Sequence, residues 1–156
     1  LAAIQKYKVN KGMMVPVMIA MLLQEPNQDQ FDCSSLEHCM YGASPMPEAL
    51  LGPAMEKFPN CKFMQGYGMT ETSPAITMLP PECHTPGNPK MKAVGRPVPW
   101  VEARIVDEND VEVPRGTVGQ IVTRGPHVMK GYWKMPEKTA EALKGGWMHT
   151  EDGGYM

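Results

Sequence analysis

The sequence predicts a mixed α/β fold in which a parallel sheet is followed by an antiparallel one. Short apolar runs alternate with helical segments over about the first 70 residues, at the spacing of strand–helix–strand units. Four prolines between residues 80 and 89 then interrupt this pattern. From residue 101 onward, apolar and charged residues alternate as in strands with one buried face. We therefore expect a parallel βαβ portion at 1–80, continuing into a small, distorted, antiparallel β-barrel subdomain at 81–156.

The first portion divides into helices and short strands. Pro16 and Pro47 each begin an apolar segment, and proline is favoured in the first turn of a helix. Pro59 ends the second of these segments, because proline cannot continue a helix. The predicted helices are 1–8, 16–23 and 47–58, and the predicted strands are 13–15, 36–41 and 62–67. Strand, helix and strand at this spacing predict a right-handed crossover in a parallel sheet.

The second portion predicts an antiparallel meander. Val101, Ala103 and Ile105 alternate with charged residues, which predicts a strand with one apolar face. We expect turns at 107–110 and 114–116, a return strand at 111–113 and a further strand at 119–124.

Composition excludes several classes of protein. The chain has 156 residues, is 42% hydrophobic and carries a net charge of −2, so it lacks the basic excess of nucleic-acid-binding domains. Its longest apolar stretch, 13–23, is too short to span a bilayer. The four cysteines have no C-x-x-C pairing, which predicts buried, reduced thiols in a cytoplasmic protein. Because the chain begins with Leu1 and ends directly after a polar cluster, we expect it to be a piece of a longer protein.

The segment QGYGMTETSP, after the third predicted strand, has the residues of a nucleotide site. Gly66 and Gly68 let the backbone approach a ligand closely, and the ring of Tyr67 offers a stacking face for a base. The hydroxyl of Thr70 can donate to a phosphate oxygen, and Glu71 can hold Mg²⁺. The segment is neither a Walker phosphate loop nor the dinucleotide motif G-x-G-x-x-G.

Two further polar loops complete the candidate site. Gly42, Ala43 and Ser44 follow one predicted parallel strand, as the glycine-rich segment follows the next, so the two loops should face one crevice. Asp152 lies in a glycine-rich segment near the end of the chain, and a fixed carboxylate suits a ribose diol. Each motif alone also fits a plain structural role, namely a tight turn, a core tyrosine or a hairpin turn.

The order of the motifs favours a functional interpretation. Over essentially its whole length the chain resembles the middle of an adenylate-forming enzyme of the acyl-CoA synthetase superfamily, within the N-terminal adenylation domain. The blocks that carry this resemblance are 42–47, 65–71, 95–97, 119–125 with 131–133, and 146–147 with 150–152.

The resemblance implies a role for each candidate residue. Gly42, Ala43 and Ser44 would line an adenine pocket, and Gly66 and Gly68 would flank the acyl and phosphate positions. Tyr67 would stack on adenine, Thr70 would contact the α-phosphate, Glu71 would coordinate Mg²⁺, and Asp152 would hold the ribose hydroxyls. The implied activity is ATP-dependent activation of a carboxylic acid, with a fatty acid as the expected substrate, followed by transfer to coenzyme A.

Two departures limit what the resemblance implies. The family's phosphate loop and its C-terminal catalytic lysine lie outside these residues, so we expect the isolated chain to be inactive. Glu151 stands where the family motif has glycine, and a side chain there would strain the backbone. The alternatives are a peptide-synthetase adenylation domain, or a non-catalytic nucleotide-binding or interaction module derived from this family.

Overall fold

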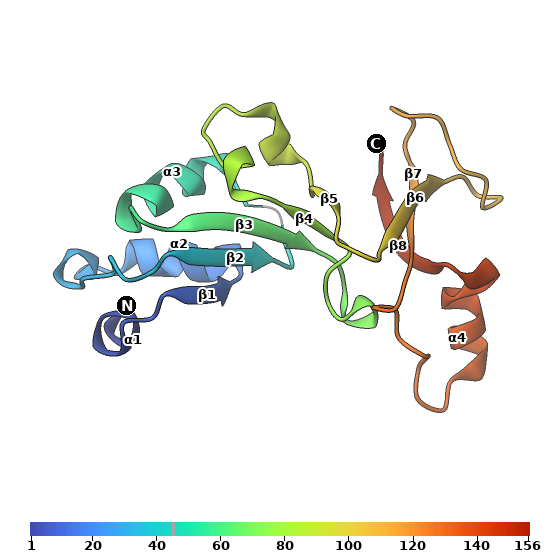
Figure 1. The fold of residues 1–156 in the computed structure, drawn as a ribbon, viewed down its shortest axis with the longest axis horizontal. Helices are drawn as coiled ribbons and strands as arrows, with labels where there is room; N and C mark the ends of the chain where they lie inside the picture. Colours follow the sequence, from blue (N-terminus) through green and yellow to red (C-terminus); the bar gives the residue numbers. More distant parts are fainter. Residues whose placement is uncertain (45) are drawn as a thin grey trace. The chain divides into compact units, whose positions relative to one another are not determined.

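The computed structural model describes residues 1–44 and 46–156 and divides them into two compact units (Figure 1). The first unit contains Leu1–Tyr67 and Thr77–Arg96. The second contains Gly68–Ile76 and Pro97–Met156. Each unit has its own sheet, and the mixed α/β fold class predicted from the sequence is confirmed.

The sheet of the first unit has five strands in the order β1-β2-β3-β4-β5. These strands are β1 (Lys11–Met14), β2 (His38–Gly42), β3 (Lys62–Tyr67), β4 (Thr77–Leu79) and β5 (Arg96–Pro97). The first three are parallel, so the predicted βαβ arrangement is confirmed. The short β4 pairs antiparallel with β3 and had not been predicted, because three residues between prolines carry too little pattern to be read as a strand.

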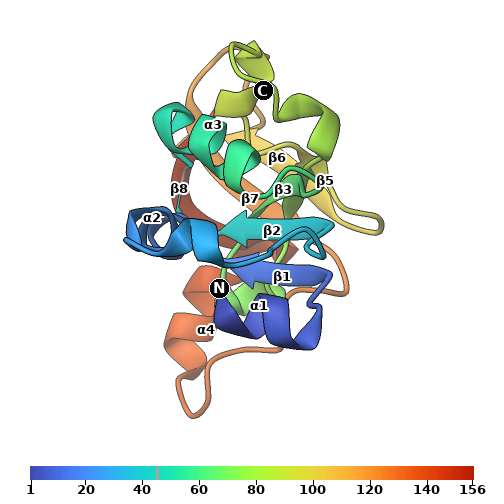
Figure 2. The ribbon, with the colours of Figure 1, turned by 90° about the vertical axis from the view of Figure 1, so that its left-hand side faces the viewer.

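Two helices supply much of the core of the first unit. They are α2 (Pro16–Gln24) and α3 (Glu48–Lys57), which connect consecutive parallel strands and pack against each other, while the short α1 (Ala2–Tyr7) precedes β1 (Figure 2). Ile19 of α2 and Leu51 of α3 are fully buried beside Cys39 and Phe63 of the sheet. All four cysteines are buried and free, as predicted.

The second unit contains an antiparallel sheet of three strands, β6 (Glu102–Val106), β7 (Gly119–Arg124) and β8 (Met148–Gly154), together with α4 (Pro136–Ala142). Within residues 68–76 and 97–156 this sheet is open, so the expected barrel is not closed here. The alternation in 101–105 and the strand at 119–124 were correctly predicted.

The predicted return strand at 111–113 is reduced to a single antiparallel bridge, between Glu112 and Val106. Backbone hydrogen bonds flank this bridge, from Asp107 N to the carbonyl oxygen of Val111 and from Val113 N to the carbonyl oxygen of Ile105. The side chain of Asp107 accepts hydrogen bonds from the backbone nitrogens of Asn109 and Val111, both at 2.9 Å, and thereby extends the turn into the expected strand. Pro114 follows at once and has no N–H to continue a ladder.

The domain boundary and the possibility of a membrane-spanning helix concern the chain as a whole. The boundary after residue 80, predicted from composition, stays a prediction about the domains of the intact protein. None of the helices within 1–44 and 46–156 combines the length and apolar character that crossing a membrane requires.

Candidate functional site

The carboxyl ends of β2 and β3 lie side by side in the first unit. Gly42 and Gly66 are register partners there, and a Cβ atom on Gly42 would lie 2.6 Å from the carbonyl oxygen of Gly66. This approach admits only glycine at position 42. The glycine-rich segment and the loop after Gly42 therefore leave the same edge of the sheet, as predicted. Pro45, part of the motif at 42–47, lies outside the described residues.

The backbone of this edge is strained at Ala43. Its φ of 66° is in the left-handed region, which costs a residue with a Cβ atom about 1–2 kcal/mol. Ala43 and Ser44 are both exposed. Tyr67 ends the neighbouring strand β3 and is half-buried.

A buried polar cluster supports the same edge from within the first unit. His84 Nδ1 faces the carbonyl oxygen of Pro80 at 3.0 Å and must donate to it, so Nε2 accepts the hydrogen bond from the Tyr41 hydroxyl at 2.9 Å. Tyr41 Oη also lies 3.4 Å from Gln65 Oε1. Burial lowers the pKa of His84 and raises the pKa of Tyr41 to about 12, so both groups are held neutral. Tyr41 and Gln65 directly precede Gly42 and Gly66, so the cluster fixes the ends of both strands.

The second unit contains the loop that carries Thr70 and Glu71. Gly68 begins this loop, and a Cβ atom there would lie 1.8 Å from the carbonyl oxygen of Pro74. Thr72 closes the short helical turn Thr70–Thr72, because its hydroxyl accepts from the backbone nitrogen of Met69 at 3.0 Å. Thr70 is exposed and Glu71 is half-buried, so the turn presents both side chains at its surface.

Glu71 is held by the segment that follows β7. The Tyr132 hydroxyl donates to Glu71 Oε1 at 2.8 Å, and the backbone nitrogen of Met129 donates to the carbonyl oxygen of Glu71 at 2.7 Å. The hydrogen bond to Glu71, followed by burial and by the charges of Glu71 and Glu151, raises the pKa of Tyr132.

Glu71 suits a Mg²⁺ ion shared with a nucleotide. Within the described residues no group of three or more histidine, cysteine, aspartate or glutamate side chains is placed to hold a metal. Mg²⁺ in nucleotide sites typically uses one or two carboxylates and takes its other ligands from phosphates and water. The single carboxylate of Glu71 therefore fits this ion and does not fit a metal held by protein side chains alone.

Asp152 lies in the strand β8, so the glycine-rich turn expected around it is wrong, as is the alternative of a hairpin turn. Gln120 and Val122 of β7, two positions apart, pair with Gly153 and His149 of β8, four positions apart, so the intervening residues form a bulge. The Thr150 hydroxyl holds this bulge, donating to the carbonyl oxygen of Ile121 at 2.7 Å and accepting from the backbone nitrogen of Asp152 at 3.1 Å. Asp152 lies within this bulge and is exposed.

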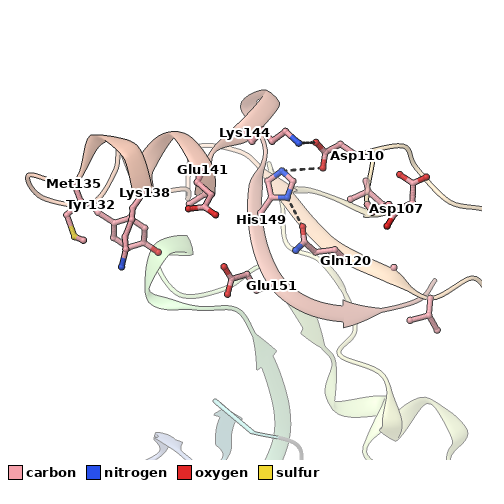
Figure 3. A pocket seen from close by; sticks show the side chains of 15 residues that line it. Asp107, Asp110, Gln120, Tyr132, Met135, Lys138, Glu141, Lys144, His149 and Glu151 are labelled. Carbon is pink, nitrogen blue, oxygen red and sulfur yellow. Dashed lines mark hydrogen bonds and ion pairs between the residues drawn. The ribbon is translucent and has the colours of Figure 1, made fainter.

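Glu151 occupies the strained position of the bulge. Its φ is 62°, which confirms that this residue adopts a conformation suited to glycine. The exposed side chain lines a cavity of about 970 Å³, together with Tyr132, Lys138 and Glu141. Figure 3 shows Glu141 and Glu151 between α4 and β8.

Four interacting polar side chains, those of Asp110, Gln120, Lys144 and His149, also line this cavity (Figure 3). His149 Nδ1 lies 2.6 Å from Gln120 Oε1, and His149 Nε2 lies 3.9 Å from Asp110. Lys144 forms an ion pair with Asp110 at 2.6 Å. The hydrogen bond from Lys144, together with the charges of Lys144 and His149, lowers the pKa of Asp110.

The candidate residues therefore divide between the two units. The first unit holds Gly42, Ala43, Ser44, Gly66 and Tyr67. The second unit holds Gly68, Thr70, Glu71 and Asp152.

The sequence did not reveal the residues that hold the candidate site residues in place through hydrogen bonds. It assigned no role to Tyr132, although the resemblance included this residue in one of its blocks. It also assigned no role to His84. Neither contact has a local signal, because Tyr132 is 61 residues from Glu71 and His84 is 43 residues from Tyr41.

Comparison with known proteins identifies the family of this chain. Residues 1–133 match the family described as AMP-binding enzyme. The chain belongs to this family, and the resemblance found in its sequence is confirmed.

Curated relatives include ligases for different acids. The chain is 40% identical to fatty acid–[acyl-carrier-protein] ligase ScoC of Streptomyces coeruleorubidus over 148 residues, which is 95% of the chain and 28% of the relative. It is 41% identical to 4-coumarate–CoA ligase of Vanilla planifolia over 158 aligned residues, which is all of the chain and 29% of that relative. The chain thus spans less than a third of the length of these relatives.

Solved structures agree with this assignment. The amide bond synthetase McbA of Marinactinospora thermotolerans matches with a TM-score of 0.87 and 36% identity over 99% of the chain and 31% of that structure. The crystal structure of VinN matches with a TM-score of 0.91 and 29% identity over 100% of the chain and 39% of that structure.

Proposed function

We propose that the chain carries the nucleotide-binding residues of an AMP-forming acid–thiol ligase. The observation that supports this most strongly is the family match over residues 1–133, which contains the glycine-rich segment with Tyr67, Thr70 and Glu71. The intact enzyme would use ATP to activate a carboxylic acid. It would then transfer the acyl group to coenzyme A.

In this proposal the first unit recognises the base. Gly42, Ala43 and Ser44 line the adenine pocket, where the exposed, left-handed backbone at Ala43 offers polar groups to the base. Tyr67 stacks on adenine from the end of β3, with Gly66 beside it at the close approach of the two strands. The neutral Tyr41–His84 pair keeps this edge rigid and adds no charge next to the base.

In the same proposal the second unit serves the phosphates and the ribose. Thr70 donates to the α-phosphate, and Gly68 brings the backbone of its loop close to the phosphate and acyl positions. Asp152 accepts the ribose hydroxyls from the bulge in β8. Glu71 holds Mg²⁺, which when bound neutralises phosphate charge.

The proposed reaction has two halves. An oxygen of the substrate carboxylate attacks the α-phosphorus of ATP, pyrophosphate leaves, and an acyl-adenylate forms. A thiolate then attacks the acyl carbon, AMP leaves, and a thioester forms. These residues contribute mainly by positioning the reactants and by stabilising charge, which account for much of the rate in such reactions.

We expect the substrate to be a fatty acid and the acceptor to be coenzyme A. The first relative is named as a fatty-acid ligase whose acceptor is an acyl-carrier protein, so a carrier-protein thiol is the alternative acceptor. The plant relatives are named for 4-coumarate. We also propose a cytoplasmic enzyme, which the four free, buried cysteines support.

The experiment measures the products formed by the intact enzyme that contains these residues. Fatty acids of several lengths and 4-coumarate are supplied with ATP, Mg²⁺ and either coenzyme A or carrier protein. Acid-dependent formation of AMP and pyrophosphate, with a thioester seen by mass spectrometry, is expected. Formation of ADP, or no acid-dependent turnover with any combination, would contradict the proposal. The isolated 156-residue chain is the negative control and should not exchange pyrophosphate into ATP.

A further inference from the structure

Tyr132 is the side chain that fixes the carboxylate of Glu71. Its hydroxyl donates to Glu71 Oε1 at 2.8 Å across 61 positions of the sequence. No hydrogen bond to Glu71 Oε2 occurs within the described residues. One carboxylate oxygen is therefore oriented by the phenol while the second is available to a cation.

Backbone hydrogen bonds also fix the segments that carry Glu71 and Tyr132. Met129, three positions before Tyr132, donates its N–H to the carbonyl oxygen of Glu71 at 2.7 Å. The backbone nitrogen of Tyr132 donates to the Thr139 hydroxyl at 2.9 Å, and that hydroxyl donates to the carbonyl oxygen of Met135 at 2.8 Å. The tyrosine is thus anchored to the start of α4, and its hydroxyl has a fixed position from which to hold Glu71.

We propose that Tyr132 is a positioning residue that orients Glu71 to bind the Mg²⁺ of a metal–nucleotide complex. This proposal rests on the proposed function, since it takes Glu71 as the metal-binding carboxylate. A carboxylate that rotates freely must be ordered when the cation binds, whereas one already held by a phenol loses less freedom.

The first experiment tests the contact in solution. The five tyrosines of the chain are labelled with ¹³C at Cζ and observed by NMR at neutral pH, and Tyr132→Phe assigns the signal of residue 132. The Tyr132 chemical shift should differ between the wild-type chain and Glu71→Gln, because this replacement removes the charged acceptor of the hydroxyl. A Tyr132 chemical shift that Glu71→Gln leaves unchanged would overturn the proposal.

The second experiment tests the effect on metal binding without any turnover. Binding of α,β-methylene-ATP to the intact enzyme is followed at increasing Mg²⁺ concentrations. Tyr132→Phe, which keeps the ring and removes the hydroxyl, should raise the half-saturating Mg²⁺ concentration by fivefold or more. Affinity for the nucleotide at saturating Mg²⁺ should change less than threefold. Tyr155→Phe is the matched control, because Tyr155 is 71% exposed in the same unit and should have no effect.

The outcomes separate this inference from the proposed function. An unchanged Mg²⁺ requirement in Tyr132→Phe overturns the positioning role. Equal losses of nucleotide affinity at all Mg²⁺ concentrations also overturn it, since they indicate a merely structural residue. A shifted Mg²⁺ requirement in an enzyme that forms no acyl-adenylate with any acid supports the role of Tyr132 and contradicts the proposed function alone.

Discussion

Glu151 is the residue at which the chain departs from its family motif, and its backbone conformation in the structure is strained. Its backbone is left-handed with φ of 62°, and its side chain is exposed toward the cavity beside α4. We expect Glu151→Gly to stabilise the folded chain by about 1 kcal/mol, because glycine adopts this conformation without strain. Chemical unfolding measures this change. Glu151→Ala is the control, since it removes the carboxylate but keeps the strained Cβ atom and should give no gain.

The same two variants test whether the Glu151 carboxylate acts on the nucleotide. We predict that neither variant changes the ATP dissociation constant of the intact enzyme at low or moderate salt. A salt-sensitive gain of tenfold or more in both variants, about 1.4 kcal/mol, would show that the carboxylate repels the phosphates. That result would favour the non-catalytic module over an enzyme.

Loss of the charge at Glu71 should mainly lower the rate of adenylation, whereas loss of the charge at Asp152 should mainly weaken ATP binding. In the intact enzyme, Glu71→Gln keeps an oxygen that can accept from Tyr132 but removes the charge that holds Mg²⁺. We expect kcat for adenylation to fall by about 10²–10³-fold, as when a group that stabilises transition-state charge is removed, with a smaller loss of ATP affinity. Asp152→Asn should mainly raise the ATP dissociation constant, by about tenfold, through weaker hydrogen bonds to the ribose.

Adenylation kinetics and calorimetric titration of ATP compare these two variants with the wild-type enzyme. Glu141→Gln is the control, because it makes the same chemical change at an exposed residue of α4. A rate loss at Glu71 no greater than that at Asp152 would contradict the assigned roles.

His84 makes the stability of the chain depend on pH. Burial lowers its pKa below the ordinary value of 6.5, so the unfolded chain binds a proton that the folded chain does not. The contribution to stability is therefore complete above the unfolded pKa and declines as the pH falls toward the lowered folded value. We expect a loss of about 1 kcal/mol between pH 7.5 and 5.5, in unfolding followed by circular dichroism. His84→Gln should reduce this slope, and an identical slope would show that His84 is not held neutral.

At the scale of elements, the loop from Gly68 to Ile76 depends on a backbone contact that no side chain can replace. A Cβ atom on Gly68 would lie 1.8 Å from the Pro74 carbonyl oxygen and 2.9 Å from the Ile76 nitrogen, and backbone atoms cannot move aside easily. Gly68→Ala should therefore destabilise the second unit by more than about 2 kcal/mol. Tryptophan fluorescence reports this change, since all three tryptophans lie in that unit.

Gly153→Ala is the matched control for this experiment. No atom lies within 4 Å of a Cβ built on Gly153, so the added methyl group meets open space. The control should leave the free energy of unfolding unchanged or raise it by about 0.5–1 kcal/mol. Equal stability of Gly68→Ala and the wild-type chain would mean that the loop has another conformation in solution.

The parallel strands could be predicted from sequence, whereas the last strand could not. The segment 62–67 matched β3 residue for residue, because an apolar run followed by glycines has a clear pattern. In β8 the residues from Glu151 to Gly154 include two charged side chains and two glycines, which favour a turn. Its pairing with β7 overrides this local preference, and the Thr150 hydroxyl stabilises the resulting bulge.

At the scale of the whole molecule, the family could be predicted because several motifs occur in a particular order along the chain. Any one of these motifs alone would not have identified the family. Tyr67 ends strand β3 and Glu71 lies in the loop after it, as many nucleotide sites require, so both could be proposed from sequence alone. Tyr132 and His84 could not be, because a long-range side-chain contact leaves no periodic trace in a single sequence. The division of the candidate residues between two units likewise appears only in three dimensions.

The measurement that tests the central claim most directly is a calorimetric titration of ATP into the intact enzyme and its Tyr67→Ala variant. If the glycine-rich segment binds the adenine nucleotide, loss of the aromatic ring should weaken binding by about 1–3 kcal/mol, the usual contribution of one base stack. Tyr7→Ala is the control, because Tyr7 is 68% exposed on α1. A dissociation constant that Tyr67→Ala leaves unchanged would contradict the claim that Tyr67 stacks on adenine in this segment.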